Sequence, residues 1–413
     1  MVKTIALAAK AAADVMRIAS TQQKNAALRE IARVLEERRG DILAANAKDL
    51  QNADAAGMPV VMRDRLRLDE TRAAALSAAA LGVEALPDPI GSYDRSHKCE
   101  NGLLLGIKRV PLGLVGIIYE SRPNVTVDAA ALCVKSGNAC LLRGGKDALQ
   151  SNLALAGAIQ EGLKRAGLPP EAVSLIGDPS RESAAEMMGL TGILDVLIPR
   201  GGAGLIRTVV ENSKVPVIET GAGNCHTYVD AEADLDMALD ITVNAKCQRP
   251  SVCNACETLL VARQVAADFL PRAKQRLDEF NVELRGCPET VAILGDGAKP
   301  ATEEDWLTEY NDFILAVRVV GDVREAAAHI NRCSTKHSEC IVTRNYDTAN
   351  AFTALIDSAC VYVNASTRFT DGEVFGLGAE IGVSTQKLHA RGPMGLTHLT
   401  GIQYVIHGNG QIR

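Results

Sequence analysis

The sequence predicts an α/β protein made of two doubly wound units in tandem. Three observations predict this fold class: strand-like and helix-like segments alternate from about residue 114, the strand-like segments are short continuous apolar runs, and a second such series starts after about residue 222. Continuous apolar strands joined by helices are typical of parallel sheets that are covered on both faces. A small ligand is expected in a cleft between two such units.

Residues 1 to about 85 are predicted to be helical, because Leu28, Ile31 and Leu35 fall on one helical face and β-branched runs are almost absent. Strand-like texture begins with LLLGIKRV (103–110). The turn residues Pro111-Leu112-Gly113 separate this segment from the next one.

The first alternating series contains five strand-like and four helix-like segments. The predicted strands are 114–119, 139–143, 173–176, 194–198 and 215–219, and the predicted helices are about 125–136, 147–166, 181–189 and 202–212. Crossovers of this kind are right-handed and produce a parallel sheet.

The second series begins with a predicted helix near 233–246. It continues with a strand at 256–262, a helix to about 280, and strands near 291–294, 313–320, 339–343 and 360–363. Two comparable α/β units are therefore expected.

Composition excludes several classes of function. The chain has 44 Lys and Arg against 50 Asp and Glu, and only 3% aromatic residues, so neither a basic groove nor base stacking for nucleic acid is indicated. No uncharged apolar run reaches the roughly 18 residues of a membrane span. The 11 cysteines are odd in number and spread through the chain, which favours a reducing cytoplasm over a disulfide framework.

The segment CQRPSVCNACETLLV (247–261) contains the strongest candidate nucleophile. Cys253 follows a turn and precedes a buried strand, and Arg249 nearby would favour its thiolate. Cys253 and Cys256 also form a C-x-x-C pair, for which a zinc site, a redox pair and two core thiols are the competing interpretations. No second ligand pair has the spacing that zinc needs, so no metal is predicted.

Two further polar residues lie at predicted strand ends. Asn124 follows the 114–119 strand and is either an oxyanion donor or a helix N-cap. Glu219 ends the 215–219 strand and is either an acid/base group or a cap of the next element.

In this order and spacing, with Cys253 placed 34 residues after Glu219, these segments resemble the aldehyde dehydrogenase superfamily. The resemblance implies an aldehyde-dehydrogenase-like fold: a Rossmann-type cofactor domain, a second α/β catalytic domain and a small oligomerisation hairpin. It also places Cys253, rather than Cys256, at the nucleophile position. Within the superfamily, strings such as YESRPNVTVDAAALCVKSGNACLLRGGKDALQSN (119–152) and GLGAEIGVSTQKLHARGPMGL (376–396) are most similar to the family of γ-glutamyl phosphate reductases.

That family resemblance implies NADPH-dependent reduction of L-glutamyl 5-phosphate to L-glutamate 5-semialdehyde in proline biosynthesis. Cys253 would form a thioester as phosphate leaves, and Asn124 would meet the oxyanion. No water is needed, so Glu219 would either help to deprotonate Cys253 or be structural. Several basic residues would compensate the phosphate: Arg122, Arg249, Lys387 and Arg391. Arg368 and Glu380 are the candidates for the substrate's α-carboxylate and α-amino groups.

The cofactor residues implied by the resemblance lie in both halves of the chain. Glu309 would hold the nicotinamide ribose, and Arg143 and Lys146 would face the adenosine ribose, where two cations favour NADP over NAD. Gly201 and Gly202 would support the pyrophosphate at a helix start.

The expected domains are 1–95 with 111–221 for NADP, 222–397 for catalysis, and 96–110 with 398–413 as oligomerisation strands. A homodimer or homotetramer in the cytoplasm is expected, acting on a small molecule, without nucleic acid or membrane, and associated with glutamate 5-kinase. Two alternatives remain open: another acyl-reducing, CoA-acylating aldehyde dehydrogenase, and a non-catalytic nucleotide-binding scaffold.

Overall fold

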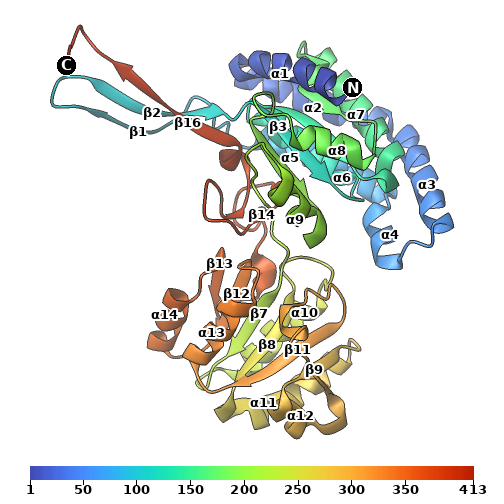
Figure 1. Ribbon diagram of the computed structural model, residues 1–413, viewed down its shortest axis with the longest axis vertical. Coiled ribbons are helices and arrows are strands. Elements are labelled where there is room, and N and C mark those ends of the chain that lie inside the picture. Colours follow the sequence, from blue (N-terminus) through green and yellow to red (C-terminus); the bar gives the residue numbers. More distant parts are fainter. The chain divides into compact units, whose positions relative to one another are not determined.

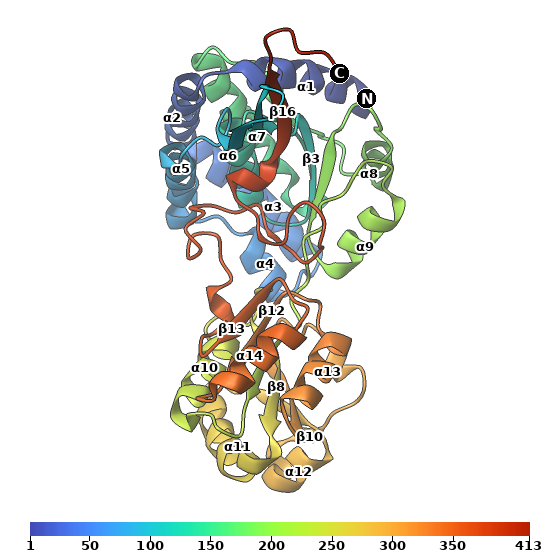
Figure 2. The same cartoon turned by 90° about the vertical axis from the view of Figure 1, so that its left-hand side faces the viewer.

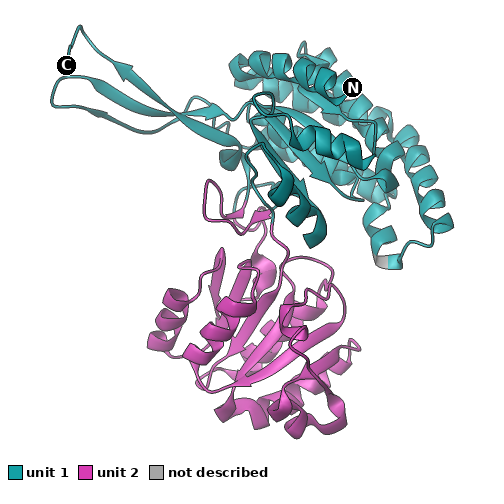
Figure 3. Cartoon of the chain, viewed as in Figure 1, with its two compact units in different colours: residues 1–220, 376–382, 394–413 teal, residues 221–375, 383–393 magenta. Residues whose placement is uncertain are grey.

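The structure is a computed structural model that describes residues 1–413, apart from the side chain of Val61. The chain divides into two compact units, which Figure 3 distinguishes by colour. Unit 1 comprises residues 1–220, 376–382 and 394–413, and unit 2 comprises residues 221–375 and 383–393.

Unit 1 starts with five helices, as predicted for residues 1–85. Ser20 begins the second of them with a capping box: its hydroxyl accepts the Gln23 N–H, and the Gln23 side chain accepts the Ser20 N–H. The helices are α1 (Val2–Ile18), α2 (Thr21–Glu37), α3 (Arg39–Ala55), α4 (Val60–Leu66) and α5 (Glu70–Ala85).

A four-stranded parallel sheet of order β5-β4-β3-β6 forms the centre of unit 1. Its strands are β3 (Leu114–Tyr119), β4 (Ala139–Gly144), β5 (Val173–Leu175) and β6 (Val196–Arg200). The connecting helices are α6 (Asn124–Lys135), α7 (Leu149–Arg165), α8 (Arg181–Met188) and α9 (Ala203–Asn212). These elements confirm the predicted alternation, except that the 215–219 segment forms one β-bridge, between Val217 and Leu197, rather than a strand.

An antiparallel arm of order β1-β2-β16 projects from the helices of unit 1 (Figure 1). Its strands are β1 (Tyr93–Lys98), β2 (Leu104–Pro111) and β16 (Thr400–His407). The edge strand β16 exposes Ile402, Tyr404 and Ile406, which alternate along one face. An exposed apolar edge of this kind is a surface that proteins normally cover.

Unit 2 contains a seven-stranded parallel sheet of order β10-β9-β11-β8-β7-β12-β13, with helices on both faces (Figure 2). Its strands are β7 (Cys225–Val229), β8 (Cys256–Ala262), β9 (Glu283–Gly286), β10 (Lys299–Pro300), β11 (Ile314–Val320), β12 (Ser338–Val342) and β13 (Cys360–Val363). Its helices are α10 (Leu235–Cys247), α11 (Arg263–Asp278), α12 (Pro288–Leu294), α13 (Val323–Cys333) and α14 (Tyr346–Leu355).

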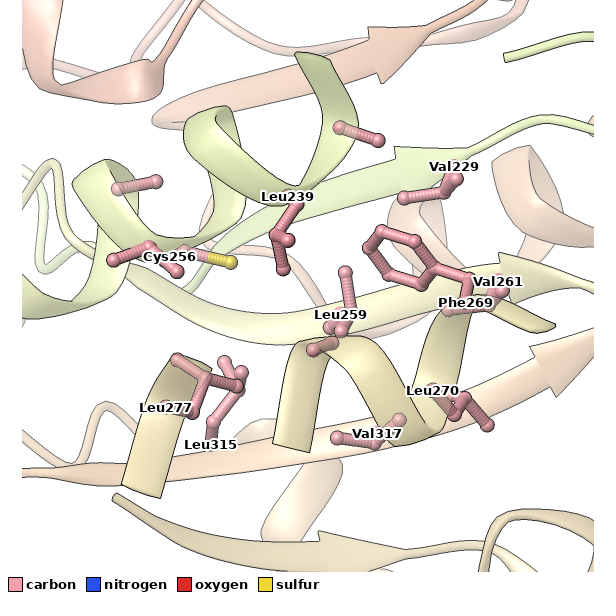
Figure 4. Close-up of a cluster of buried hydrophobic side chains, with 14 of the residues drawn as sticks. Val229, Leu239, Cys256, Leu259, Val261, Phe269, Leu270, Leu277, Leu315 and Val317 are labelled. Atoms are coloured by element: carbon pink, nitrogen blue, oxygen red, sulfur yellow. The ribbon is translucent and has the colours of Figure 1, made fainter. Parts of the chain in front are cut away.

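The two faces of this sheet have separate cores because side chains alternate along each strand. Leu259 and Val261 of β8 pack with Phe269 of α11 on one face (Figure 4), whereas Leu260 packs with Phe352 of α14 on the other. The apolar runs of the sequence are therefore explained by double-sided burial.

One sequence prediction for unit 2 is wrong, and its strands β7, β9 and β10 were not predicted. Residues 291–294 form the end of helix α12 and not a strand, because Pro288 starts a helix and a short apolar run does not distinguish the two states. The buried strand β7 was not predicted, since its His226 and Thr227 are polar yet fully buried.

The amino ends of the central strands lie in one row. Cys225 of β7 pairs with Cys256 of β8, Glu339 of β12 pairs with His226 of β7, and Ser338 pairs with Cys360 of β13. Segments that enter these strands therefore lie along the same edge of the sheet, about 4.8 Å apart per strand. None of the described helices is long and apolar enough to cross a membrane.

Candidate active site

Cys253 lies in the turn that leads into β8, at the amino edge of the unit 2 sheet, and it is partly exposed. The turn is closed by the Ala255 N–H, which donates to the Val252 carbonyl at 3.0 Å. The side chain can therefore meet a ligand while its backbone is held.

Cys225, the first residue of β7, and Gly223, which precedes that strand, both contact the backbone of Cys253. The Cys225 thiol donates to the Cys253 carbonyl at 3.2 Å, and a Cβ on Gly223 would lie 1.4 Å from the same oxygen. Only glycine at position 223 leaves room for the turn that contains the candidate nucleophile Cys253, which is called the nucleophile turn below.

Arg249 and Arg368 lie next to this turn. Arg368 Nε donates to Gln248 Oε1 at 3.0 Å, and its Nη1 donates to Asn254 Oδ1. Burial and the neighbouring positive charge of Arg249 lower the pKa of Arg368, while Cys253 is a neighbour with the opposite effect. Two predicted anion-binding residues thus converge beside the candidate nucleophile Cys253.

Lys387 and Arg391 belong to a different cationic group in unit 2. Lys387 Nζ, Arg391 Nη2 and Lys336 Nζ contact the carboxylate of Asp357 at 3.1, 2.8 and 2.9 Å. These cations hold the pKa of Asp357 well below its usual range. The sequence analysis did not identify Asp357 or Lys336. They precede β13 and β12, and the pairing of these two strands brings them together.

Cys256 is a core thiol. It is fully buried at the first position of β8 and packs near Leu239 and Leu259 (Figure 4). Burial raises the pKa of its thiol to about 11. In the part of the chain that the structure describes, no three His, Cys, Asp or Glu side chains are grouped as a metal site would require.

Glu309 lies in the turn before β11 and contacts the backbone of Gly223, which also lies against Cys253. Its Oε1 accepts the Gly223 N–H at 2.8 Å, and Gly223 packs against Cys253. Gly223 thus connects the Glu309 carboxylate to the backbone of Cys253.

In unit 1, the candidate residues collect at the carboxyl ends of the parallel strands. Asn124 is the exposed first residue of α6, and its Nδ2 donates to Asp128 Oδ2 at 3.0 Å. It therefore pairs one helical turn along instead of capping the helix. Burial raises the pKa of Asp128 to about 6, against the opposing effect of this hydrogen bond.

The other unit 1 candidates are Arg122, Glu219 and Glu380. Arg122 follows β3, Glu219 follows the bridge at Val217, and both are partly exposed. Glu380 lies in the 376–382 segment, whose backbone is held by the Ile381 N–H donating to the Met394 carbonyl at 2.9 Å.

Arg143 lies next to the last residue of β4 and Lys146 follows this strand, at the end of the sheet where a ligand of an open α/β sheet is expected. Arg143 Nη2 donates to the carbonyls of Pro179 and Ser180 at 2.6 and 2.7 Å, but its Nε is buried without a partner. An unsatisfied buried donor beside the exposed Lys146 fits an additional anionic ligand such as a phosphate.

The start of α9 fits a phosphate less simply. The Gly202 N–H already donates to Glu120 Oε2 at 2.8 Å, and a Cβ on Gly201 would lie 2.7 Å from that carboxylate. A pyrophosphate here would have to displace the Glu120 side chain.

Comparison with known proteins agrees with this fold. Residues 1–291 match the aldehyde dehydrogenase family. The chain is 56% identical over 405 residues to the gamma-glutamyl phosphate reductase of Clostridium perfringens (98% of this chain, 97% of the relative). It is 57% identical over 412 residues to that of Carboxydothermus hydrogenoformans (100% and 99%). The crystal structure of gamma-glutamyl phosphate reductase from Thermotoga maritima superimposes with a TM-score of 0.97 at 49% identity, covering 100% of this chain and 99% of that one.

The chain therefore belongs to the aldehyde dehydrogenase family. Within it, the extent of identity to these relatives places the chain among the γ-glutamyl phosphate reductases (glutamate-5-semialdehyde dehydrogenases), which are oxidoreductases of proline biosynthesis.

Proposed function

We propose that the protein reduces L-glutamyl 5-phosphate to L-glutamate 5-semialdehyde with NADPH, through a thioester on Cys253 and with release of phosphate. The observation that carries this proposal is a partly exposed cysteine, held by its backbone at a strand end, with Arg249 and Arg368 beside it. A thiolate is the nucleophilic form of cysteine, and nearby cations favour it.

The reaction needs no water. The Cys253 sulfur forms a bond to the acyl carbon, the bond from that carbon to the phosphate oxygen breaks, and its electron pair leaves with phosphate. Reduced nicotinamide, when bound, supplies the hydride that converts the thioester to the aldehyde level. The carbon–sulfur bond then breaks, the aldehyde is released and the thiolate returns.

The leaving phosphate is the reason for two arginines at this turn, since guanidinium groups bind phosphate in a bidentate manner. We assign Arg249 and Arg368 to the phosphate on their places next to Cys253, which revises the substrate role expected for Arg368. Lys387 and Arg391, grouped with Asp357, are assigned to the carboxylate-bearing end of the substrate, which revises the phosphate role expected for them.

From unit 1, we assign Asn124 to the oxyanion, Arg122 to the phosphate and Glu380 to the amino-acid end of the substrate. Glu219 is assigned to the deprotonation of Cys253 or to a structural role; these roles rest on the family resemblance. Asp128 orients the Asn124 amide through its hydrogen bond. For the cofactor, Arg143 and Lys146 suit the 2′-phosphate that distinguishes NADP, Gly201 and Gly202 the pyrophosphate, and Glu309 the nicotinamide ribose.

We further propose a cytoplasmic homo-oligomer that receives its labile acyl phosphate from glutamate 5-kinase. The exposed apolar face of β16 supports self-association, and the 11 cysteines, which form no disulfide in the described residues, suit a reducing compartment.

The test is the initial rate of NADP⁺ reduction with L-glutamate 5-semialdehyde. The proposal predicts a rate that requires inorganic phosphate, is not supported by CoA in its place, and is lost in Cys253→Ser. Cys256→Ser is the matched control and should retain most of the activity. A rate that depends on CoA, or one that survives Cys253→Ser, would overturn the proposal.

A further inference from the structure

A buried ion pair joins the two elements on either side of the nucleophile turn. Lys246 Nζ, in the last turn of α10, lies 2.6 Å from Glu257 Oε2, at the second position of β8, and neither side chain is exposed. Removing two charges from water is costly, and apolar residues of similar volume often stabilise a protein as well or better. The presence of charge here therefore calls for a reason other than stability.

The pair contacts the turn that contains Glu309. The second carboxylate oxygen of Glu257 accepts the Asn311 N–H at 3.2 Å, and Lys246 Nζ lies 5.8 Å from the centroid of the Tyr310 ring. Asn311 has a left-handed backbone with φ of 57°, a conformation that costs energy outside glycine and persists where the surroundings fix it.

Each of the two charged residues has a reason to be buried here. The Asn311 N–H needs an acceptor at a site where Glu257 is shielded from water, and Glu257 needs Lys246 as its counter-ion. Burial raises the pKa of Glu257 to about 7 despite the opposing effect of Lys246, so an unpaired carboxyl would be protonated more readily here.

The fixed position of Asn311 also restricts Glu309, the candidate cofactor residue in the same turn. Glu309 comes two residues before Asn311, and its Oε1 is held by the Gly223 N–H at 2.8 Å. One end of the turn is thus fixed by the buried pair and the other by the backbone that supports Cys253.

We propose that Lys246 and Glu257 are positioning residues that fix the 309–311 turn, so that the Glu309 carboxylate is held where the nicotinamide ribose of the cofactor binds. The inference rests on the proposed role of Glu309. Lys246 and Glu257 do not touch the cofactor themselves. Their removal weakens only the contact between the protein and the nicotinamide half of the cofactor.

Two double variants isolate this role. Lys246→Met/Glu257→Leu removes both charges and the acceptor for the Asn311 N–H. Lys246→Met/Glu257→Gln removes both charges but leaves an amide oxygen that can still accept this hydrogen bond. Neither variant leaves a single unpaired charge in the core, so both are expected to fold.

The readout is ligand affinity measured by calorimetry, with NADPH and with 2′,5′-ADP, which lacks the nicotinamide ribose. The Met/Leu variant is expected to bind NADPH about tenfold more weakly and 2′,5′-ADP within twofold of the unchanged protein, whereas the Met/Gln variant binds both within about threefold. In a Glu309→Ala background, the Met/Leu change should weaken NADPH binding no further, because both changes remove the same contact.

Equal weakening of both ligands by Met/Leu would mean a general structural role and would overturn the inference. An unchanged NADPH affinity in Met/Leu would overturn it as well. Glu309→Ala alone tests the underlying cofactor assignment: if that variant binds NADPH normally, the assignment of Glu309 fails, and the inference fails with it while the Cys253 chemistry stands.

Discussion

Gly223→Ala is expected to displace the nucleophile turn. The added Cβ would lie 1.4, 2.2 and 2.6 Å from the carbonyl oxygen, carbonyl carbon and Cα of Cys253, all of which are backbone atoms with no rotamer to change. Real Cβ contacts essentially never fall under 3.0 Å, so the two segments must separate by about 1.6 Å at the closest point. Displacements of about 1 Å in an active site cost on the order of 100-fold in rate.

We therefore expect Gly223→Ala to lower kcat by about 100-fold, equivalent to about 2.7 kcal/mol of activation free energy. The assay is phosphate-dependent NADP⁺ reduction, with iodoacetamide labelling of Cys253 and circular dichroism as measures of the turn and the fold. Gly82→Ala is the matched control, because no atom lies within 4 Å of its Cβ position and α5 tolerates alanine. A folded Gly223→Ala protein that keeps more than a third of the normal kcat would refute this reasoning.

Four further predictions follow from other contacts. Arg368→Met should raise the KM for phosphate about tenfold and that for the semialdehyde less than twofold, whereas Arg391→Met should show the reverse pattern in steady-state kinetics; the same pattern in both variants would contradict the two assignments. Glu120→Gln should tighten NADPH binding several-fold in calorimetry, because it neutralises the carboxylate that occupies the Gly202 N–H; unchanged affinity would place the pyrophosphate elsewhere. The pKa of Asp128 is raised to about 6 in the folded state, so its contribution to stability is present at low pH and is lost as the pH rises from about 4 to 6. The melting temperature of Asp128→Asn should therefore fall less over this range than that of the unchanged protein. Parallel plots of melting temperature against pH would refute this expectation. Iodoacetamide at pH 7 should label Cys253 much faster than Cys256, whose burial keeps its thiol protonated, and mass spectrometry of the peptides decides this.

Much of the fold could be predicted from the sequence because its strands are buried on both faces. The run CETLLVA at 256–262 was placed with its observed bounds, because its residues from Leu259 to Ala262 are all apolar and are buried on both faces of the sheet. The prediction failed where tertiary contacts override local preference: CHTYV forms strand β7 although His226 is polar, because Glu339 accepts from its buried backbone and ring.

The site was predictable only in part. The place of Cys253 at a strand entry follows from the turn residues before it and the apolar run after it. The contacts that tune the site follow from the pairing of strands far apart in the chain, which no local pattern reveals. Two examples are the hydrogen bond from the Cys225 thiol to the Cys253 carbonyl and the ion pairs that Asp357 forms with three cations. The pairing of Asn124 with Asp128 is an exception, since the i,i+4 spacing on a predicted helix could have indicated it.

The most direct test is to look for the acyl group on sulfur. The protein is mixed with L-glutamate 5-semialdehyde and NADP⁺ in the absence of phosphate, quenched in acid and digested, and the peptide that contains Cys253 is weighed by mass spectrometry. We predict the added mass of one glutamyl group on Cys253, lost again when phosphate is supplied before the quench. An adduct on another cysteine, or NADPH formation in a first turnover with every cysteine peptide unmodified, would contradict the account.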